Sequence, residues 1–274
     1  MTEPNSKQQP ARPQPSRVGL SPALLGLVGF AAFGLLLEVL PRIGVLREQY
    51  FPPSSRIVVA LVKQIPDASF RAALGNTLLT WIIALAIAVA GGVLVGVLIG
   101  SVPVLREATA STIEFLRPIP SVALIPGLVV LLGTGRPSTL VIAVYASFWQ
   151  VLVQVLHGVA DLDPIARETA RSYRLGVLWR IRYVLWPTAL PYAMTGIRLA
   201  AAVALILTVT GELVIGTPGL GKSIDLAYSS GDAPSMFALI VVTGIIGIAA
   251  NVLTRAAERR VLLWHPSVRG EIPA

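Results

Sequence analysis

Six apolar runs constrain the fold of this chain more than any other feature of its sequence. Their residues are 22–40, 76–100, 108–132, 138–156, 188–215 and 235–255. Runs of about 20 apolar residues are long enough for a helix to cross the hydrocarbon core of a bilayer. Charged residues make up only 13% of the chain, whereas soluble domains contain about a quarter. The sequence therefore predicts an all-α integral membrane protein with about six transmembrane helices.

The basic residues indicate how these helices are oriented. The net charge is +8, but Lys and Arg lie mainly in the loops and tails, where they set topology and contact anionic membrane lipid. This distribution argues against a nucleic-acid partner and predicts that both termini are cytosolic. The segment 41–75, expected on the outer side, departs from the rule, since it carries Arg42, Arg47, Arg56, Lys63 and Arg71. No Cys is present, which excludes disulfides, thiol chemistry and cysteine metal sites.

The ends of the chain differ from its centre. Residues 1–21 are rich in Pro, Gln, Ser and Arg, so they cannot bury enough apolar surface to offset the entropy of ordering. We expect a disordered cytosolic tail over 1–21, a transmembrane domain over 22–260 and a short cytosolic tail over 261–274. The first apolar run has basic residues ahead of it, as a signal peptide does, but no small-residue cleavage site follows, which favours a retained helix.

The third apolar run contains residues that a simple membrane helix does not tolerate. They are Glu114, Arg117, Pro118, Pro120 and Pro126. Proline leaves backbone carbonyls without partners, which is acceptable in a membrane only beside protein or a water-filled cavity. We therefore expect a broken helix that lines a pathway. A structural kink, in which Glu114 and Arg117 neutralise each other, is the alternative.

The stretch 163–191 is charged in its first half and aromatic or aliphatic in its second. Its arginines alternate with Ala and Leu at spacings that predict an amphipathic helix at a membrane surface over about 163–183. Asp163 and Pro164 suit the N-cap and the first helical position, while Pro187 and Pro191 interrupt or restart the helix. The pattern alone is also compatible with a basic helix that only holds topology.

Part of this stretch resembles the signature of ABC importer permeases, in which Glu-Ala-Ala is followed at fixed spacing by Gly, Ile, Leu and Pro. The matching residues are Glu168, Thr169, Ala170, Val184, Trp186 and Pro187. Arg174 occupies the glycine position, with Gly176 nearby, and Trp186 stands where leucine is usual. The run 115–127, FLRPIPSVALIPG, is similar to a helix of the permeases for nitrate, sulfonates and taurine.

A second motif, GTPGLGKS at 216–223, matches the phosphate-binding pattern of nucleotide hydrolases as a string. That pattern requires a strand before the loop and a helix after it inside an α/β sheet, whereas here a membrane helix precedes the loop. We therefore interpret it as a coincidence. The same glycines resemble the loop between the last two spans of these permeases, where Gly219 and Gly221 would turn back towards the pore.

The resemblance implies the transmembrane subunit of an ABC importer of the nitrate, sulfonate and taurine type, located in the inner membrane. Such a subunit is not an enzyme and needs no cofactor or metal. Its expected partners are a separate ABC ATP-binding subunit, an extracytoplasmic solute-binding protein and a second permease subunit, identical or related. The segment 163–183 would be the cytosolic coupling helix between the fourth and fifth spans. The implied ATPase-coupling residues are Glu168, Thr169, Ala170, Arg171, Arg174, Gly176 and Pro187.

Ionisable residues within membrane spans are candidates for function by default. With the prolines and glycines above, the pathway candidates are Glu114, Arg117, Pro118, Pro120, Arg198, Glu212, Gly219 and Gly221. Two other classes of membrane protein are alternatives to an importer subunit. A channel or secondary transporter without an ATPase partner would show paired broken helices in two related halves, and a membrane-bound nucleotide hydrolase would rest on GTPGLGKS alone.

Overall fold

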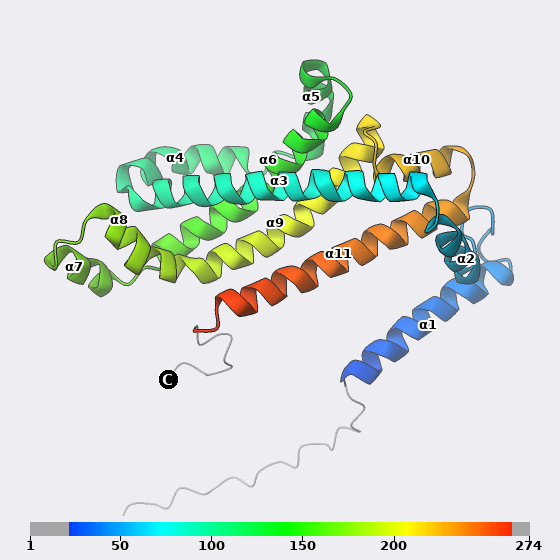
Figure 1. Cartoon of the computed structure of the whole chain (residues 1–274), viewed down its shortest axis with the longest axis horizontal. Helices are drawn as coiled ribbons and strands as arrows, with labels where there is room; N and C mark the ends of the chain where they lie inside the picture. Colours follow the sequence, from blue (N-terminus) through cyan, green and yellow to red (C-terminus); the bar gives the residue numbers. More distant parts are fainter. Residues whose placement is uncertain (1–21, 265–274) are drawn as a thin grey trace, which may run out of the picture.

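A computed structural model describes residues 22–264, and all its regular elements are helical (Figure 1). They are α1 (Pro22–Arg42), α2 (Ser54–Gln64), α3 (Ala68–Ser101), α4 (Pro103–Leu116), the 3₁₀ turn η1 (Ser121–Leu124), α5 (Ile125–Leu132), α6 (Arg136–Ala160), α7 (Pro164–Ser172), α8 (Val177–Arg180), the π-helical turn η2 (Ile181–Leu185), α9 (Trp186–Ile215), α10 (Leu220–Ser229) and α11 (Ala233–Val261). The tail predicted over 1–21 and most of the tail predicted over 261–274 lie outside the described residues.

Five segments of the described chain are long and apolar enough to cross a membrane. A sixth crossing results if α4 and the η1–α5 segment count as one span, which is bent by 82° at its break. Successive crossings alternate in direction, so that α7 lies at the same end of the bundle as the end of α11 (Figure 1). The structure therefore confirms the all-α prediction and the expected broken third run.

α3 and α6 run parallel and meet along a row of glycines, which we call the glycine ladder: Gly92, Gly96 and Gly100. A Cβ atom on these residues would lie 2.7, 2.8 and 2.8 Å from atoms of Val151, Val155 and Val159, respectively. Such distances are shorter than side-chain contacts allow, so the two backbones meet this closely only because the glycines have no side chain. Small residues at helix contacts are typical of membrane bundles.

α9 crosses α6 in the opposite direction and uses the same device. A Cβ atom on Gly158 of α6 would lie 2.8 Å from the Cα of Ala189, and one on Gly211 of α9 would lie 2.8 Å from Thr139. α6 is thus held between α3 and α9, and it contributes buried residues along most of its length. This arrangement places α6 at the centre of the bundle.

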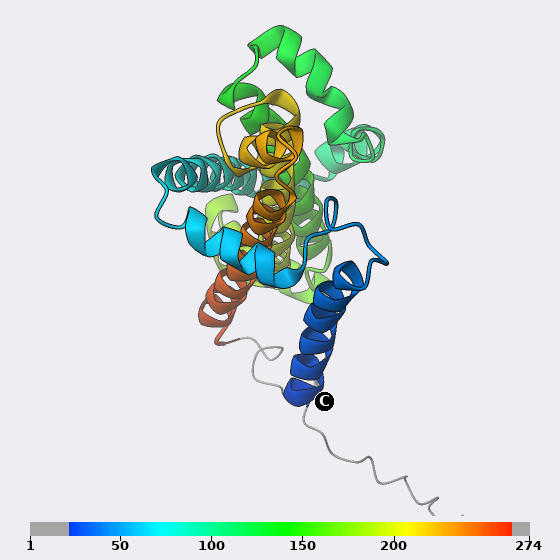
Figure 2. The same ribbon diagram turned by 90° about the vertical axis from the view of Figure 1, so that its right-hand side faces the viewer.

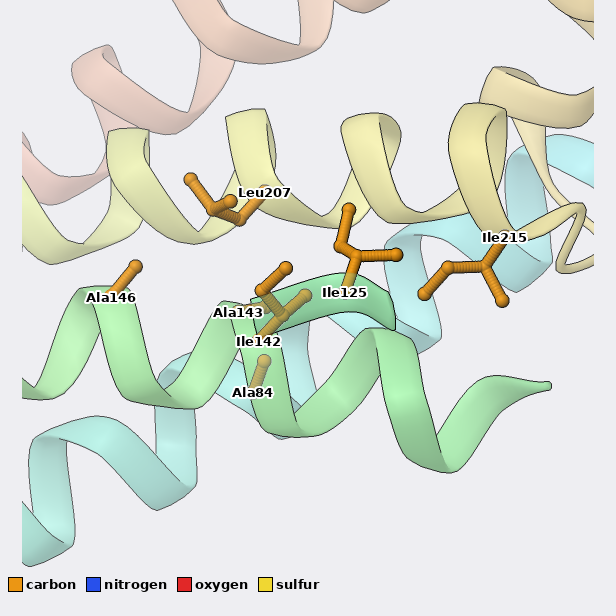
Figure 3. Packing of buried hydrophobic residues seen from close by; sticks show 7 residues of the cluster. All are labelled: Ala84, Ile125, Ile142, Ala143, Ala146, Leu207 and Ile215. Carbon is orange, nitrogen blue, oxygen red and sulfur yellow. The ribbon is translucent and has the colours of Figure 1, made fainter. Parts of the chain in front are cut away.

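A hydrophobic cluster joins the broken segment to this centre (Figure 3). Its buried members come from α3, α5, α6 and α9: Ala84, Ile125, Ile142, Ala143, Ala146, Leu207 and Ile215. Ile125, the first residue of α5, is only 6% exposed, whereas Val130 and Leu131 in the same helix are 85% and 79% exposed. α5 is therefore anchored at its first turn and projects from the bundle beyond it.

α1 lies apart from the bundle and contacts it through α2 (Figure 2). Glu38 links the two helices, because its carboxylate accepts hydrogen bonds from the backbone N–H and hydroxyl of Ser55 at 2.8 and 2.9 Å. Glu38 also pairs with Arg42, and Glu48 pairs with Arg56 at 2.9 Å. Two of the basic residues that departed from the topology rule are thus partly neutralised within this segment.

α3 begins at Ala68, eight residues before the start expected at residue 76. Asp67 is its N-cap: one carboxylate oxygen accepts the backbone N–H of Ser69 at 2.9 Å. This hydrogen bond, with a second from the Ser69 hydroxyl, holds the pKa of Asp67 below its ordinary value. The turn before α3 is therefore fixed by a charged cap of the kind that helix N-termini favour.

Candidate functional site

The predicted coupling segment forms α7, a short helix that projects from one end of the bundle (Figure 1). Asp163 caps it, since one carboxylate oxygen accepts the backbone N–H of Ile165 at 2.8 Å, and Pro164 follows at the first position. Ala170 is its buried residue, whereas Glu168, Thr169 and Arg171 are exposed. The cap is as predicted, and α7 leaves these polar side chains exposed in the single chain.

The single helix expected over about 163–183 is wrong, because the chain breaks after Ser172. The N–H of Leu175 donates to the carbonyl of Ala170 at 3.0 Å, and that of Arg174 donates to Arg171 at 2.8 Å. This pair of bonds is a Schellman motif, which needs a left-handed residue at the position of Arg174. Arg174 has φ 52° and is the one non-glycine residue with positive φ in the described chain. Arg174 therefore adopts the left-handed conformation that glycine favours, although it carries a side chain.

The chain resumes at Gly176, the N-cap of α8, and continues through η2 into α9. Pro187 lies at the start of α9, but the helical backbone continues into it from η2, so its missing N–H removes a hydrogen bond beside the π-helical turn. Pro191 lies inside α9, which continues past it, and this corrects the expectation that Pro191 interrupts or restarts the helix. The seven predicted coupling residues thus lie on α7, in the turn after it and at the start of α9, and their coupling role stays a prediction.

The broken segment places four of the pathway candidates at its bend. Glu114 lies near the end of α4, and Arg117, Pro118 and Pro120 follow between α4 and η1. All four are exposed in the single chain, and no ion pair joins Glu114 to Arg117 in the part of the chain that the structure describes. The neutralised kink is therefore not observed. The Leu116 carbonyl at the break accepts the N–H of Ile119 at 3.2 Å and the Tyr145 hydroxyl at 2.8 Å, so Tyr145 ties the bend to α6.

Arg198 lies elsewhere in the bundle, on α9. Its guanidinium pairs with Glu258 of α11 at 3.4 Å, and both side chains are partly exposed. The pair links two helices near the end of α11. The structure therefore does not bring Arg198 together with Arg117, and it gives Arg198 a partner within the chain.

Glu212 is fully buried and receives the loop that follows α9. Its Oε2 accepts the Thr77 hydroxyl at 2.8 Å and the backbone N–H of Gly221 at 3.0 Å, while the N–H of Leu220 donates to the Thr77 oxygen at 2.8 Å. These residues, with Gly219, form what we call the Glu212 cluster. The cluster ties the start of α10 to α3 and α9, so this loop turns back into the bundle.

The glycines of GTPGLGKS have a structural role in this cluster. A Cβ atom on Gly219 would lie 2.1 Å from the Glu212 carboxyl carbon, and one on Gly221 would lie 2.2 Å from the Val209 carbonyl oxygen. Gly216 ends α9 in a left-handed conformation with φ 81°. A helix, not a strand, precedes the loop. The string therefore lacks the context of a phosphate-binding loop, and its glycines are explained by close backbone approach.

Reasoning from the sequence missed Thr77 and Tyr145, which hold Glu212 and the bend. Both lie inside apolar runs, where a single hydroxyl is a common residue. A buried Glu212 requires hydrogen-bond donors, which is the only indication in the sequence that such hydroxyls exist. The sequence does not identify which hydroxyls they are.

Comparisons with known proteins agree with this architecture. Residues 88–263 match the family described as "Binding-protein-dependent transport system inner membrane component". The taurine transport system permease protein TauC of Escherichia coli (strain K12) is 30% identical over 228 residues, which cover 80% of this chain and 82% of that protein. The nitrate import permease protein NrtB of Leptolyngbya laminosa is 26% identical over 62% of this chain and 61% of its own length.

A solved structure shows the same fold. The MetNI methionine ABC transporter, in an inward-facing conformation, contains a chain that matches with a TM-score of 0.61 and 19% identity, covering 75% of this chain and 97% of that one. Together with the family match, which spans residues 88–263, these similarities show that the chain belongs to the binding-protein-dependent inner-membrane components, the permeases of ABC importers.

Proposed function

We propose that this chain is the pathway-forming permease subunit of an ATP-driven importer for a small anionic solute, with both termini in the cytosol. A separate ATP-binding subunit docks on α7 and supplies the energy. An extracytoplasmic binding protein delivers the solute at the opposite end of the bundle. In this proposal α7 is the contact through which closure of the ATP-binding subunits changes access to the pathway.

The exposure of α7 is the observation that carries this proposal. Ile165 is 73% exposed on α7, and Tyr173 directly after it is 78% exposed. Large apolar side chains beside exposed charges at a water-facing end are typical of a surface that a protein partner covers. Glu168 lies on the same short helix and offers a carboxylate for a charged contact within the partner's groove.

A second permease subunit completes the pathway in this proposal. The projecting end of α5 exposes Val130 and Leu131, and the four polar or proline candidates lie at the adjoining bend. A partner related by a two-fold axis would cover α5 and enclose the bend between two subunits. Glu114 and Arg117 would then border a shared pathway instead of facing lipid.

The proposed solute class follows from the names of the relatives, which are permeases for taurine, nitrate and aliphatic sulfonates. A solute with an oxyanion group would be attracted by Arg117, whose guanidinium has no ion-pair partner among the described residues. We assign Arg117 to solute passage, and Glu212 and its loop to holding the outer end of the bundle.

Charge reversal at Glu168 tests the docking role of α7. The variant Glu168→Lys, co-expressed with the ATP-binding subunit and the binding protein of its transporter, should lose co-purification of the ATP-binding subunit and solute uptake in proteoliposomes. Glu107→Lys is the matched control, because Glu107 is also an exposed acid but lies on α4. Full uptake and co-purification by Glu168→Lys would contradict the docking role.

A further inference from the structure

A cavity of about 280 Å³ lies between α7 and the turn that joins α3 to α4. Its lining includes four arginines, which we call the arginine cavity residues: Arg106, Arg167, Arg171 and Arg180. None of the described residues that line it is Asp or Glu, and none of the ion pairs within residues 22–264 involves these four arginines. Four like charges around one cavity repel one another without a carboxylate to offset them.

Two buried polar groups of the lining also lack partners. The Arg180 Nε and the Ser101 Oγ are both inaccessible to solvent, and neither has a hydrogen-bond partner among the described residues. A buried donor without a partner destabilises the folded chain, and more so when the donor is charged. The two groups come from different elements of the lining, since Ser101 ends α3 and Arg180 ends α8. Because neither atom reaches the accessible surface, the terminal nitrogens of the four guanidinium groups, and not these two atoms, would contact a ligand in the cavity.

We propose that the arginine cavity binds a tetrahedral oxyanion, specifically a phosphate group. Arginine is suited to this ligand because its planar guanidinium donates two hydrogen bonds to neighbouring oxygens and its charge is permanent. The volume of about 280 Å³ accommodates one such group but not a whole phospholipid. The phosphate is either that of an anionic lipid headgroup, whose acyl chains remain in the bilayer, or a free ion.

The position of the site gives the ligand a structural consequence. Arg167 and Arg171 belong to α7, Arg180 to α8, and Arg106 to α4. A phosphate bound to all four would connect the projecting segment to the end of α3 and the start of α4. The bound anion would thus hold α7 in place on the bundle, which neither the α7 cap nor the Schellman motif does.

The experiment uses the purified full chain in maltoside micelles, which contain no phosphate. Inorganic phosphate is titrated in one arm and short-chain phosphatidylglycerol in the other, and the thermal unfolding midpoint is followed. We expect a saturable rise that becomes smaller as NaCl is added, since salt screens the arginine charges. A rise in the phosphate arm identifies a free-ion site, and a rise in the phosphatidylglycerol arm alone identifies a lipid headgroup site.

Arg180→Gln should weaken binding at least tenfold, because one charge-assisted contact contributes about that factor. Arg182→Gln is the matched control: it removes the same charge two residues away, at an exposed position outside the cavity. Arg106→Gln, on the exposed part of α4, should weaken binding similarly and provides the test if the Arg180 variant does not fold. No rise in either arm, or equal binding by the Arg182 variant and both cavity variants, would overturn the proposal.

Discussion

The left-handed residue at the end of α7 leads to the most direct test of how this segment is built. Arg174 adopts φ 52° because the two hydrogen bonds that end α7 require it. This conformation costs roughly 1–2 kcal/mol of free energy for a residue with a Cβ atom, and almost none for glycine. Arg174→Gly should therefore relieve strain at one defined position without changing the path of the chain.

The stabilisation expected from Arg174→Gly is smaller than the strain that the substitution removes. Glycine is more flexible in the unfolded chain, which costs about 0.5–1 kcal/mol on folding. The net stabilisation of the α7 end should therefore be about 0.5–1 kcal/mol. Arg174→Ala is the matched control, because it removes the same guanidinium but keeps the Cβ atom. The difference between the two variants isolates the backbone contribution.

Amide hydrogen exchange of peptides that span residues 164–176 measures this difference. The informative amides are those of Arg174 and Leu175, which donate the two terminating bonds. A difference of about 1 kcal/mol corresponds to roughly fivefold slower exchange in Arg174→Gly than in Arg174→Ala, if opening is local. Equal exchange, or slower exchange in the alanine variant, would refute the argument that this position is strained.

Two further predictions concern packing within the bundle. Gly96→Ala places a Cβ atom 2.8 Å from Val155 and should lower the free energy of unfolding by about 1–3 kcal/mol. Gly244→Ala is the control: its Cβ atom would have nothing within 4 Å, so this variant should be neutral or mildly stabilising. The thermal unfolding midpoints in detergent distinguish the two variants. Glu212→Gln retains a carbonyl oxygen for Thr77 and Gly221 and should fold, whereas Glu212→Ala leaves the buried Gly221 N–H unpaired at a cost of about 1–3 kcal/mol. Equal unfolding midpoints for the two Glu212 variants would contradict the role given to this carboxyl.

The sequence was sufficient to predict the elements whose cause is local. Apolar length predicted the membrane helices, and the Asp163–Pro164 pair predicted where α7 begins. The prolines around Pro118 predicted the bend, because missing backbone donors act on the residues beside them. The glycines of the second apolar run are small residues of the kind that permit close helix contact, but only the fold shows that α6 supplies the valines.

Other features depend on contacts between distant residues and were not predictable. The end of α7 was placed too late, because an arginine gives no sign that it will adopt a left-handed conformation. The pairing of Arg198 with Glu258 and of Glu212 with Thr77 joins residues 60 and 135 positions apart. The sequence marked Arg198 and Glu212 as unusual inside a membrane, and only the fold shows which partners they have.

The glycine ladder has a consequence for how this protein can move. Three successive turns of α3 fit against Val151, Val155 and Val159, so sliding either helix would force side chains where no room exists. α3 and α6 should therefore move together as one rigid body. If α7 drives the proposed change of access, the backbone must bend outside these two helices. The helical hydrogen bonding already changes at the π-helical turn Ile181–Leu185 and at the bend after Leu116.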